Sequence, residues 1–220
     1  MRKAHDEQRG CSLITPDRQL ARRVASELGR WDIHVDDSAG KPLADTEQGI
    51  FFRLVGEVCA PAARAHDIVA LLGHSLMADE LVAGTDSRSL AKTLEIALFR
   101  QVPGGHHLRG LAARISQART LAQDRFSHPL VKNIAPEQWD SLSALAAQFE
   151  QIMTPLLDLS DAGDSSPLAS LLNVHISVAE TLSAGTGGVS DRLWTGEAGN
   201  ALSETLRGLL DHAAAAPAMP

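Results

Sequence analysis

LSALAAQFEQIMTPL, residues 142–156, decides the fold class, because its large apolar side chains recur every three or four positions (Leu142, Leu145, Phe149, Ile152 and Leu156). That spacing places them on one face of an α-helix, which we expect to begin near Pro136. Comparable apolar faces occur on both sides, at residues 50–58, 68–76, 90–98, 108–115, 168–179 and 202–210. Aromatic residues make up only 4% of the 220 residues. The composition therefore favours a mostly α-helical protein over an aromatic-rich β-sandwich.

The N-terminal part carries a different pattern, which predicts a small α/β piece. Residues 11–15 form a short apolar run that is typical of a buried strand, and Ile33-His34-Val35 alternates like a second strand. Between them, apolar residues at helical spacing predict a helix over about 18–31. A strand, a helix and a strand in this order indicate a parallel βαβ unit.

The residues around the expected strand ends have structural roles in this interpretation. Thr15 suits a helix N-cap, Pro16 suits the first helical position, and Asp17 and Arg18 open the helix. Asp36, Asp37 and Gly40 form a turn after the second strand. Two parallel strands cannot form a stable sheet alone. We therefore expect the chain to be an internal fragment whose sheet is completed by residues elsewhere.

The four lysines exclude two kinds of catalytic site. A phosphate-binding loop needs Gly-Lys-Ser/Thr, but only Lys41 follows a glycine, and Pro42 comes next. A nuclease core with Asp/Glu-x-Lys is also absent, because no acidic residue lies two positions before Lys3, Lys41, Lys92 or Lys132. Neither motor nor nuclease activity of these kinds is expected in this chain.

Charge is distributed unevenly within the overall net charge of −7. Residues 88–132 hold eight basic and two acidic residues, whereas the segments on both sides are acidic. A basic stretch in an acidic protein is a candidate contact for the phosphates of DNA. The alternative interpretation is a helical face whose arginines pair with acidic residues of the C-terminal third. The DNA-contact hypothesis assigns this role to Arg100, Arg109, Arg114, Arg119, Arg125 and Lys132.

Two further motifs are weak. Gly73-His74-Ser75-Leu76-Met77 resembles the G-x-S-x-G nucleophile elbow, but Met77 stands where the second glycine is needed, and we expect a helix end there. Metal binding by Asp36 and Asp37 with Asp45, or by His106 and His107 with His128, is also disfavoured by the spacing, so no metal site is expected.

The order of residues in three segments resembles the AddB family, the nuclease and helicase-like subunits of AddAB complexes that repair DNA double-strand breaks in alphaproteobacteria. SLITPDRQLARRVASELGRW at residues 12–31 carries most of the likeness, followed by IHVDDSAGKPL at 33–43 and by Thr46, Gly49 and FFRL at 51–54. Residues 71–76 (LLGHSL) and 193–199 (LWTGEAG) resemble later segments of the family. The family usually has proline where this chain has Ser75.

The resemblance implies a fold and an organisation. Residues 11–75 would begin a RecA-like domain of the UvrD 2A type, and residues 76–212 would form its helical 2B-like insertion. We expect residues 1–10 and 213–220 to be disordered. No catalytic residue is carried over, because the family's nuclease and iron–sulfur cluster lie in a region not present here.

The leading hypothesis is therefore a non-catalytic fragment of an AddB-like subunit, without a cofactor of its own. Its expected partners are DNA, an AddA-like motor that uses ATP and magnesium, and the remainder of its own subunit. A cytoplasmic location is expected, with Cys11 and Cys59 as free thiols, because no signal peptide or membrane span is apparent. The alternatives are a helical protein-interaction module without DNA contact and a small serine hydrolase that uses Ser75.

Overall fold

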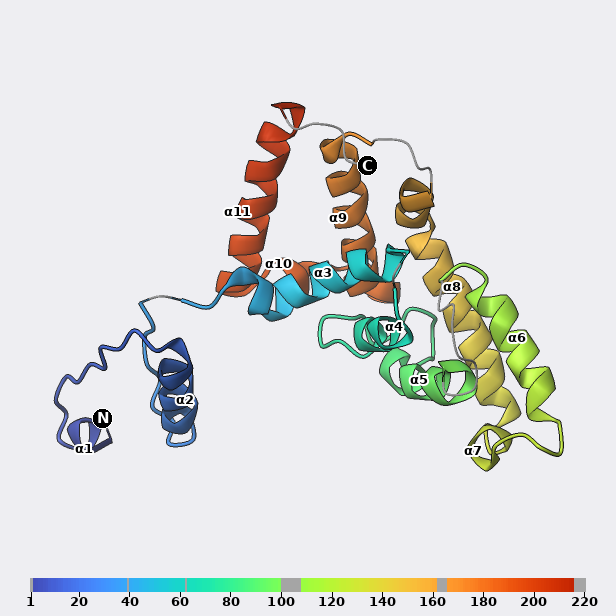
Figure 1. Ribbon diagram of the computed structural model, residues 1–220, viewed down its shortest axis with the longest axis horizontal. Helices are drawn as coiled ribbons and strands as arrows, with labels where there is room; N and C mark the ends of the chain where they lie inside the picture. The colour runs from blue at the N-terminus through green and yellow to red at the C-terminus, as the bar shows by residue number, and fades with distance from the viewer. Residues whose placement is uncertain (1, 39, 62, 100–107, 162–165, 216–220) are drawn as a thin grey trace. The chain divides into compact units, whose positions relative to one another are not determined.

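The computed structural model describes residues 2–38, 40–61, 63–99, 108–161 and 166–215, and these are mostly α-helical (Figure 1). The helical prediction is thus confirmed. The chain divides into two compact units, one covering Met1–Lys41 and the other Pro42–Pro220. This division lies earlier than the boundary expected at residue 75. No helix within the described ranges is long and apolar enough to cross a membrane.

The first unit contains α1 (Arg2–Asp6) and α2 (Arg18–Gly29). The N-cap of α2 is Asp17 instead of Thr15, because the Asp17 carboxylate accepts hydrogen bonds from the backbone N–H groups of Gln19 and Leu20 at 2.9 and 3.1 Å. The Thr15 hydroxyl accepts from the Asp17 N–H at 3.1 Å. The N-cap of α2 therefore lies two residues after Thr15, so Pro16 precedes the helix, and α1 occupies part of the lead that was expected to be disordered.

The two predicted strands at residues 11–15 and 33–35 are wrong as descriptions of this structure: no residue there is in a strand, and none occurs elsewhere in the described ranges. The physical reason is the lack of a neighbouring strand, since parallel strands need partners on their edges and cover on both faces. Ile14, which a sheet would bury, is 94% exposed.

The second unit begins with the 3₁₀ turn η1 and contains the remaining helices. Their bounds are η1 Leu43–Asp45, α3 Glu47–Cys59, α4 Ala65–Leu72, α5 Ser87–Leu94 with the π-helical turn η2 Glu95–Phe99, α6 Leu111–Ala122, α7 Pro129–Lys132, α8 Pro136–Asp161, α9 Leu168–Ala184, η3 Gly185–Gly187, α10 Asp191–Trp194, α11 Gly196–His212 and η4 Ala213–Ala215.

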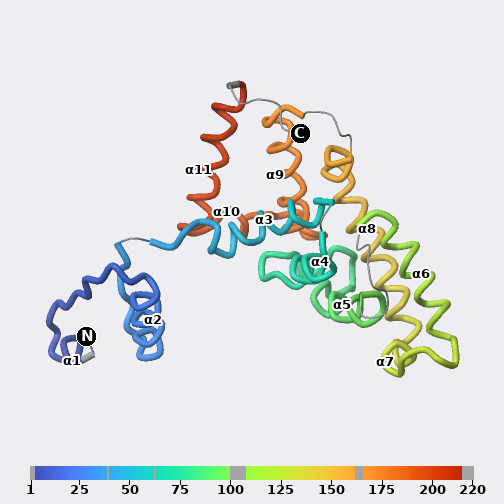
Figure 2. The backbone as a smooth tube through the Cα atoms, in the orientation of Figure 1, coloured from blue at the N-terminus to red at the C-terminus, as the bar shows by residue number. Residues whose placement is uncertain are grey.

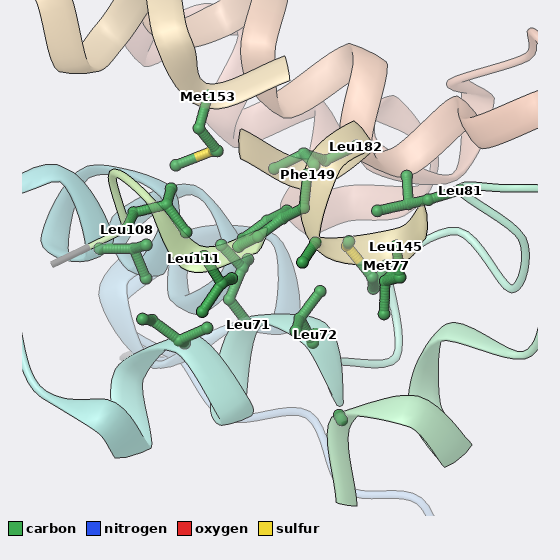
Figure 3. Close-up of a cluster of buried hydrophobic side chains, with 14 of the residues drawn as sticks. Leu71, Leu72, Met77, Leu81, Leu108, Leu111, Leu145, Phe149, Met153 and Leu182 are labelled. Atoms are coloured by element: carbon green, nitrogen blue, oxygen red, sulfur yellow. The ribbon is translucent and has the colours of Figure 1, made fainter. Parts of the chain in front are cut away.

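Helix α8 lies at the centre of this second unit and begins at Pro136, as the sequence predicts. It packs against α5, α6, α3 and α9 (Figure 2). Its apolar face enters one continuous core, in which Leu145 and Phe149 lie among Leu71, Leu72 and Leu111 (Figure 3). Phe149 has no exposed surface. Burial of this face drives the assembly of the surrounding helices.

The segment between α4 and α5 is fixed to the end of α9 by backbone hydrogen bonds. Ala78 N–H donates to the Leu182 carbonyl at 3.0 Å, and Thr186 N–H donates to the Glu80 carbonyl at 3.0 Å. Gly185 has φ of +55° and lies so close to the Glu80 carbonyl that a side chain there would collide with it. These contacts join residues 76–80 to the C-terminal third of the chain.

Candidate nucleic-acid interface

Five of the six predicted DNA-contact residues lie on or near α6: Arg109 just before it, Arg114 and Arg119 on it, Arg125 in the turn after it and Lys132 at the end of α7. Arg109 donates to two carboxylates near the end of α8, from Nη2 to Asp158 at 2.6 Å and from Nε to Asp161 at 2.5 Å. These hydrogen bonds raise the pKa of the Arg109 guanidinium, the bond to Asp158 having the largest effect. Arg109 therefore forms ion pairs with two carboxylates of α8.

Arg119, towards the other end of α6, also forms an ion pair with a carboxylate of α8. Its Nη1 donates to Asp140 of α8 at 2.5 Å. The Glu150 carboxylate also accepts from the Gly110 N–H at 2.6 Å, at the N-terminus of α6. Because α6 lies beside α8 (Figure 1), these contacts follow from helix packing. They match the alternative interpretation of the basic stretch, in which its arginines pair with acidic residues.

Arg114 lies between these two arginines on α6 and is half-buried. Burial lowers the pKa of its guanidinium, and the nearby charge of Glu150 opposes that effect. A half-buried guanidinium beside a carboxylate is poorly placed to meet a phosphate in solvent. Arg100, His106 and His107 lie outside the described residues.

Arg125 and Lys132 differ from the α6 arginines, because within the described ranges neither makes an ion pair with a carboxylate. Lys132 Nζ donates to the backbone carbonyl of Arg125 at 2.7 Å. The Arg125 guanidinium lies over the Phe126 ring, 4.7 Å from the ring centroid. Both cations are exposed. They are the predicted site residues that the structure leaves accessible to an anion.

Phe126 is a candidate that sequence reasoning missed. Its residue surface is 83% exposed, the highest value among the phenylalanines of the described chain, where Phe51 and Phe149 are fully buried. The signal was its position: it lies in the polar run Asp-Arg-Phe-Ser-His at 124–128, outside any apolar helical face. The structure brings together Arg125, Phe126 and Lys132 and separates them from the other predicted residues.

The turn at Ser75 does not have the geometry of a hydrolase site. Ser75 is exposed, and its backbone carbonyl accepts hydrogen bonds from Nη2 of Arg88 at 3.1 Å and of Arg192 at 2.7 Å. His74 Nδ1 accepts from the Leu76 N–H at 3.2 Å, and burial lowers the pKa of this histidine. In the part of the chain that the structure describes, no histidine is hydrogen-bonded to the Ser75 hydroxyl. The LLGHSL motif instead joins α4, α5 and α10.

The acidic and histidine candidates for metal binding have other roles. Asp37 accepts a bidentate interaction from Arg18, and His128 caps α7 by accepting from the Leu130 N–H at 3.2 Å. Across the described ranges, histidine, cysteine and acidic side chains form no group of three that could hold a metal ion.

Arg18 and Asp37 join the start of α2 to the turn near the C-terminal end of the N-terminal unit. Arg18 Nη1 and Nη2 donate to the two carboxylate oxygens of Asp37 at 3.0 and 2.9 Å, and Nη2 also donates to the Gly40 carbonyl at 3.0 Å. The hydrogen bond to Asp37 raises the pKa of the Arg18 guanidinium. Arg18 at the helix start thus contacts Asp37 and Gly40 of the turn, a contact that the sequence did not predict, whereas Asp36 is exposed.

Comparison of the chain with protein-family models, with curated proteins and with solved structures finds no match.

Proposed function

We propose that this chain is a non-catalytic part of an AddB-like subunit in an ATP-dependent helicase–nuclease that processes DNA double-strand breaks. The proposal starts from the sequence resemblance of residues 12–54 and of the two later segments. The structural observation that carries it is the bidentate Arg18–Asp37 interaction in the N-terminal unit.

This interaction supports the parallel βαβ arrangement expected for the start of a RecA-like domain. Arg18 is the first residue of α2, three residues after the end of the first expected strand, and Asp37 lies two residues after the end of the second. In a parallel βαβ unit the C-terminal ends of both strands lie at the same edge of the sheet. A contact between Arg18 and Asp37 brings these two ends together without a formed sheet.

The exposed apolar side chains of the same unit supply the second support. Leu13, Ile14, Leu20 and Trp31 are all more than 40% exposed, and Leu28 is the buried apolar residue of the unit. A 41-residue unit with so little buried apolar surface cannot stabilise itself well. We infer that the remaining strands, supplied by the rest of the subunit, cover these side chains. Residues 76–212, which lie within the helical second unit, then correspond to the 2B-like insertion.

In this function the chain's role is to bind and position, and the reactions occur elsewhere. ATP and magnesium belong to an AddA-like motor partner, and the nuclease and any iron–sulfur cluster belong to the remainder of the subunit. The four lysines, none of which stands in a phosphate-binding or nuclease motif, agree with this division of work.

The test is co-purification with the motor and nuclease segments encoded next to this chain in its genome. We expect co-elution, and protection of the amides of residues 11–15 and 33–35 from hydrogen exchange only in the complex. Ile14→Asp should abolish that protection, whereas His34→Gln, at an exposed position of the same unit, should not. Absence of such neighbouring genes, or equal protection in the isolated chain, contradicts the proposal.

A second candidate function, direct contact with DNA, is favoured by the accessible cations Arg125 and Lys132. A duplex of about 20 base pairs titrated at low and moderate salt tests it, because phosphate contacts make affinity fall as salt rises. If neither the duplex nor a single strand of similar length binds at low salt, or if binding has no salt dependence, this contact is excluded.

A further inference from the structure

We infer that residues 121–132, which comprise the end of α6, the loop that follows and α7 and are called the turn below, bind single-stranded nucleic acid by stacking a base on Phe126. This inference rests on the proposed DNA contact and makes it specific, because it names the strand form and the side chain that would recognise it. It depends on three observations about the turn. The Phe126 ring is exposed, local hydrogen bonds hold the backbone that carries it, and Arg125 and Lys132 lie beside it.

The ring of Phe126 lies outside the hydrophobic core. Phe51 and Phe149 have no exposed surface, and Phe52 and Phe99 pack against the core. Phe126, by contrast, is 83% exposed and contacts the Arg125 guanidinium. A phenylalanine exposed in this way presents an apolar ring on which a nucleobase can stack.

Local hydrogen bonds hold the backbone that carries this ring. The Asp124 carboxylate accepts from the Phe126 N–H at 2.8 Å, and the Asp124 carbonyl accepts from the Ser127 N–H at 3.1 Å. The Ser127 hydroxyl donates to the Leu121 carbonyl at 2.5 Å, at the end of α6. Because these hydrogen bonds already order the turn, binding costs little further conformational entropy.

The turn presents two exposed cations, Arg125 and Lys132, that can contact an anion. The carboxylate of Asp124, the acidic residue of the turn, accepts a hydrogen bond from the backbone and, within the described residues, forms no ion pair with Arg125 or Lys132. Arg125 and Lys132 lie together through the 2.7 Å hydrogen bond from Lys132 Nζ to the Arg125 carbonyl. Single-strand sites combine such cations with an exposed ring, the cations contacting phosphates and the ring stacking on a base.

Single strands fit this turn better than a duplex or a protein surface. A duplex keeps its bases stacked and would meet two cations, too few for tight binding through phosphates alone. A protein partner would use Leu121 and Leu130, which are 55% and 47% exposed, as much as Phe126. A base instead needs a π face, which Phe126 supplies and the two leucines do not.

The experiment measures fluorescence anisotropy of the full chain with a labelled oligothymidine of roughly 15 nucleotides and with a hairpin duplex, at several salt concentrations. Phe126→Leu removes the π face but keeps an apolar side chain, and Phe126→Trp enlarges the π face. Leu130→Ala is the matched control for apolar contact. Arg119→Ala is the control for charge, since Arg119 is paired with Asp140. Circular dichroism checks that each variant folds.

We expect the wild-type chain to prefer the single strand, and Phe126→Leu to weaken that binding about tenfold. Phe126→Trp should retain or improve it, and both controls should stay within about twofold of wild type. Replacing Arg125 and Lys132 by alanine should reduce the salt dependence by roughly one phosphate contact or more.

Each contrary result has a separate meaning. If the chain binds neither strand form at low salt, both the DNA contact and this inference are wrong. Binding that Phe126→Leu leaves unchanged overturns the stacking inference alone. If Leu130→Ala weakens binding as much as Phe126→Leu, the turn acts as an apolar docking surface, which overturns it as well.

Discussion

His175 of α9 is hydrogen-bonded to α3: its Nε2 lies 2.8 Å from the Phe52 carbonyl oxygen. The two rings stack with their centroids 3.9 Å apart and an angle of 12° between their planes. The carbonyl can only accept, so Nε2 carries the proton and donates. Burial lowers the pKa of His175, although the hydrogen bond to Phe52 opposes that effect. The imidazole is therefore neutral at pH 7.

This pair predicts how stability depends on pH. Because the folded pKa of His175 lies below its unfolded value, the stabilisation is present above about pH 6.5 and is lost as pH falls below that value. His74, whose pKa burial also lowers, contributes in the same direction. We expect urea unfolding to show lower stability at pH 5 than at pH 7.5.

His175→Gln should flatten that pH dependence and should destabilise the chain by about 1–3 kcal/mol at pH 7.5, because the stacked, hydrogen-bonded ring is lost. The control is His34→Gln, since the His34 side chain is 91% exposed in the N-terminal unit. An unchanged pH profile in His175→Gln would show that other groups cause the acid sensitivity.

The helical part of the fold could be predicted from the sequence because it depends on neighbours along the chain. The spacing of Leu142, Leu145 and Phe149 fixes one face of α8 wherever its partners lie. Residues 11–15 have the apolar character of a strand, but a strand also needs partners in space, and Ile14 shows that these are lacking here. The strand prediction therefore failed because a strand depends on neighbouring strands, which the sequence of residues 11–15 alone does not reveal.

The candidate site was predicted less well, for a related reason. Counting charges along residues 88–132 finds the arginines but not the carboxylates of α8 that face them. Asp140 and Asp158 lie 21 and 49 residues from their arginine partners, so no local pattern pairs them. Phe126 was missed because an isolated aromatic residue in a polar run has no periodicity.

The Arg119–Asp140 ion pair predicts a small effect on stability. Its side chains are 38% and 68% exposed, so solvent screens their interaction. Arg119→Ala and Asp140→Ala should each lower the free energy of unfolding by less than about 1 kcal/mol. Urea denaturation of both single variants and the double variant measures this. A coupling energy well above that value would show that the pair fixes α6 on α8.

The two cysteines should differ sharply in reactivity. Cys59 is 8% exposed in the core, and burial raises the pKa of its thiol to about 12, whereas Cys11 is exposed. The thiolate is the reactive form, so only Cys11 should react quickly with a disulfide reagent at pH 7.5. Cys11→Ala should remove the fast reaction, and Cys59→Ala should leave it unchanged. Two fast thiols in the native chain would contradict the burial of Cys59.

The Ser75 hydroxyl should be chemically inert, whereas the Ser75 backbone carbonyl stabilises the turn by accepting hydrogen bonds from Arg88 and Arg192. Without a hydrogen-bonded histidine its hydroxyl has no general base, so a fluorophosphonate should not label the chain. Ser75→Ala should leave stability within about 0.5 kcal/mol of wild type, because the side chain is exposed. Arg192→Ala should cost about 1 kcal/mol, since it removes the 2.7 Å charged donor to the Ser75 carbonyl. Labelling that disappears in Ser75→Ala would instead establish a nucleophile, and a neutral Arg192→Ala would show that Arg88 alone holds the turn.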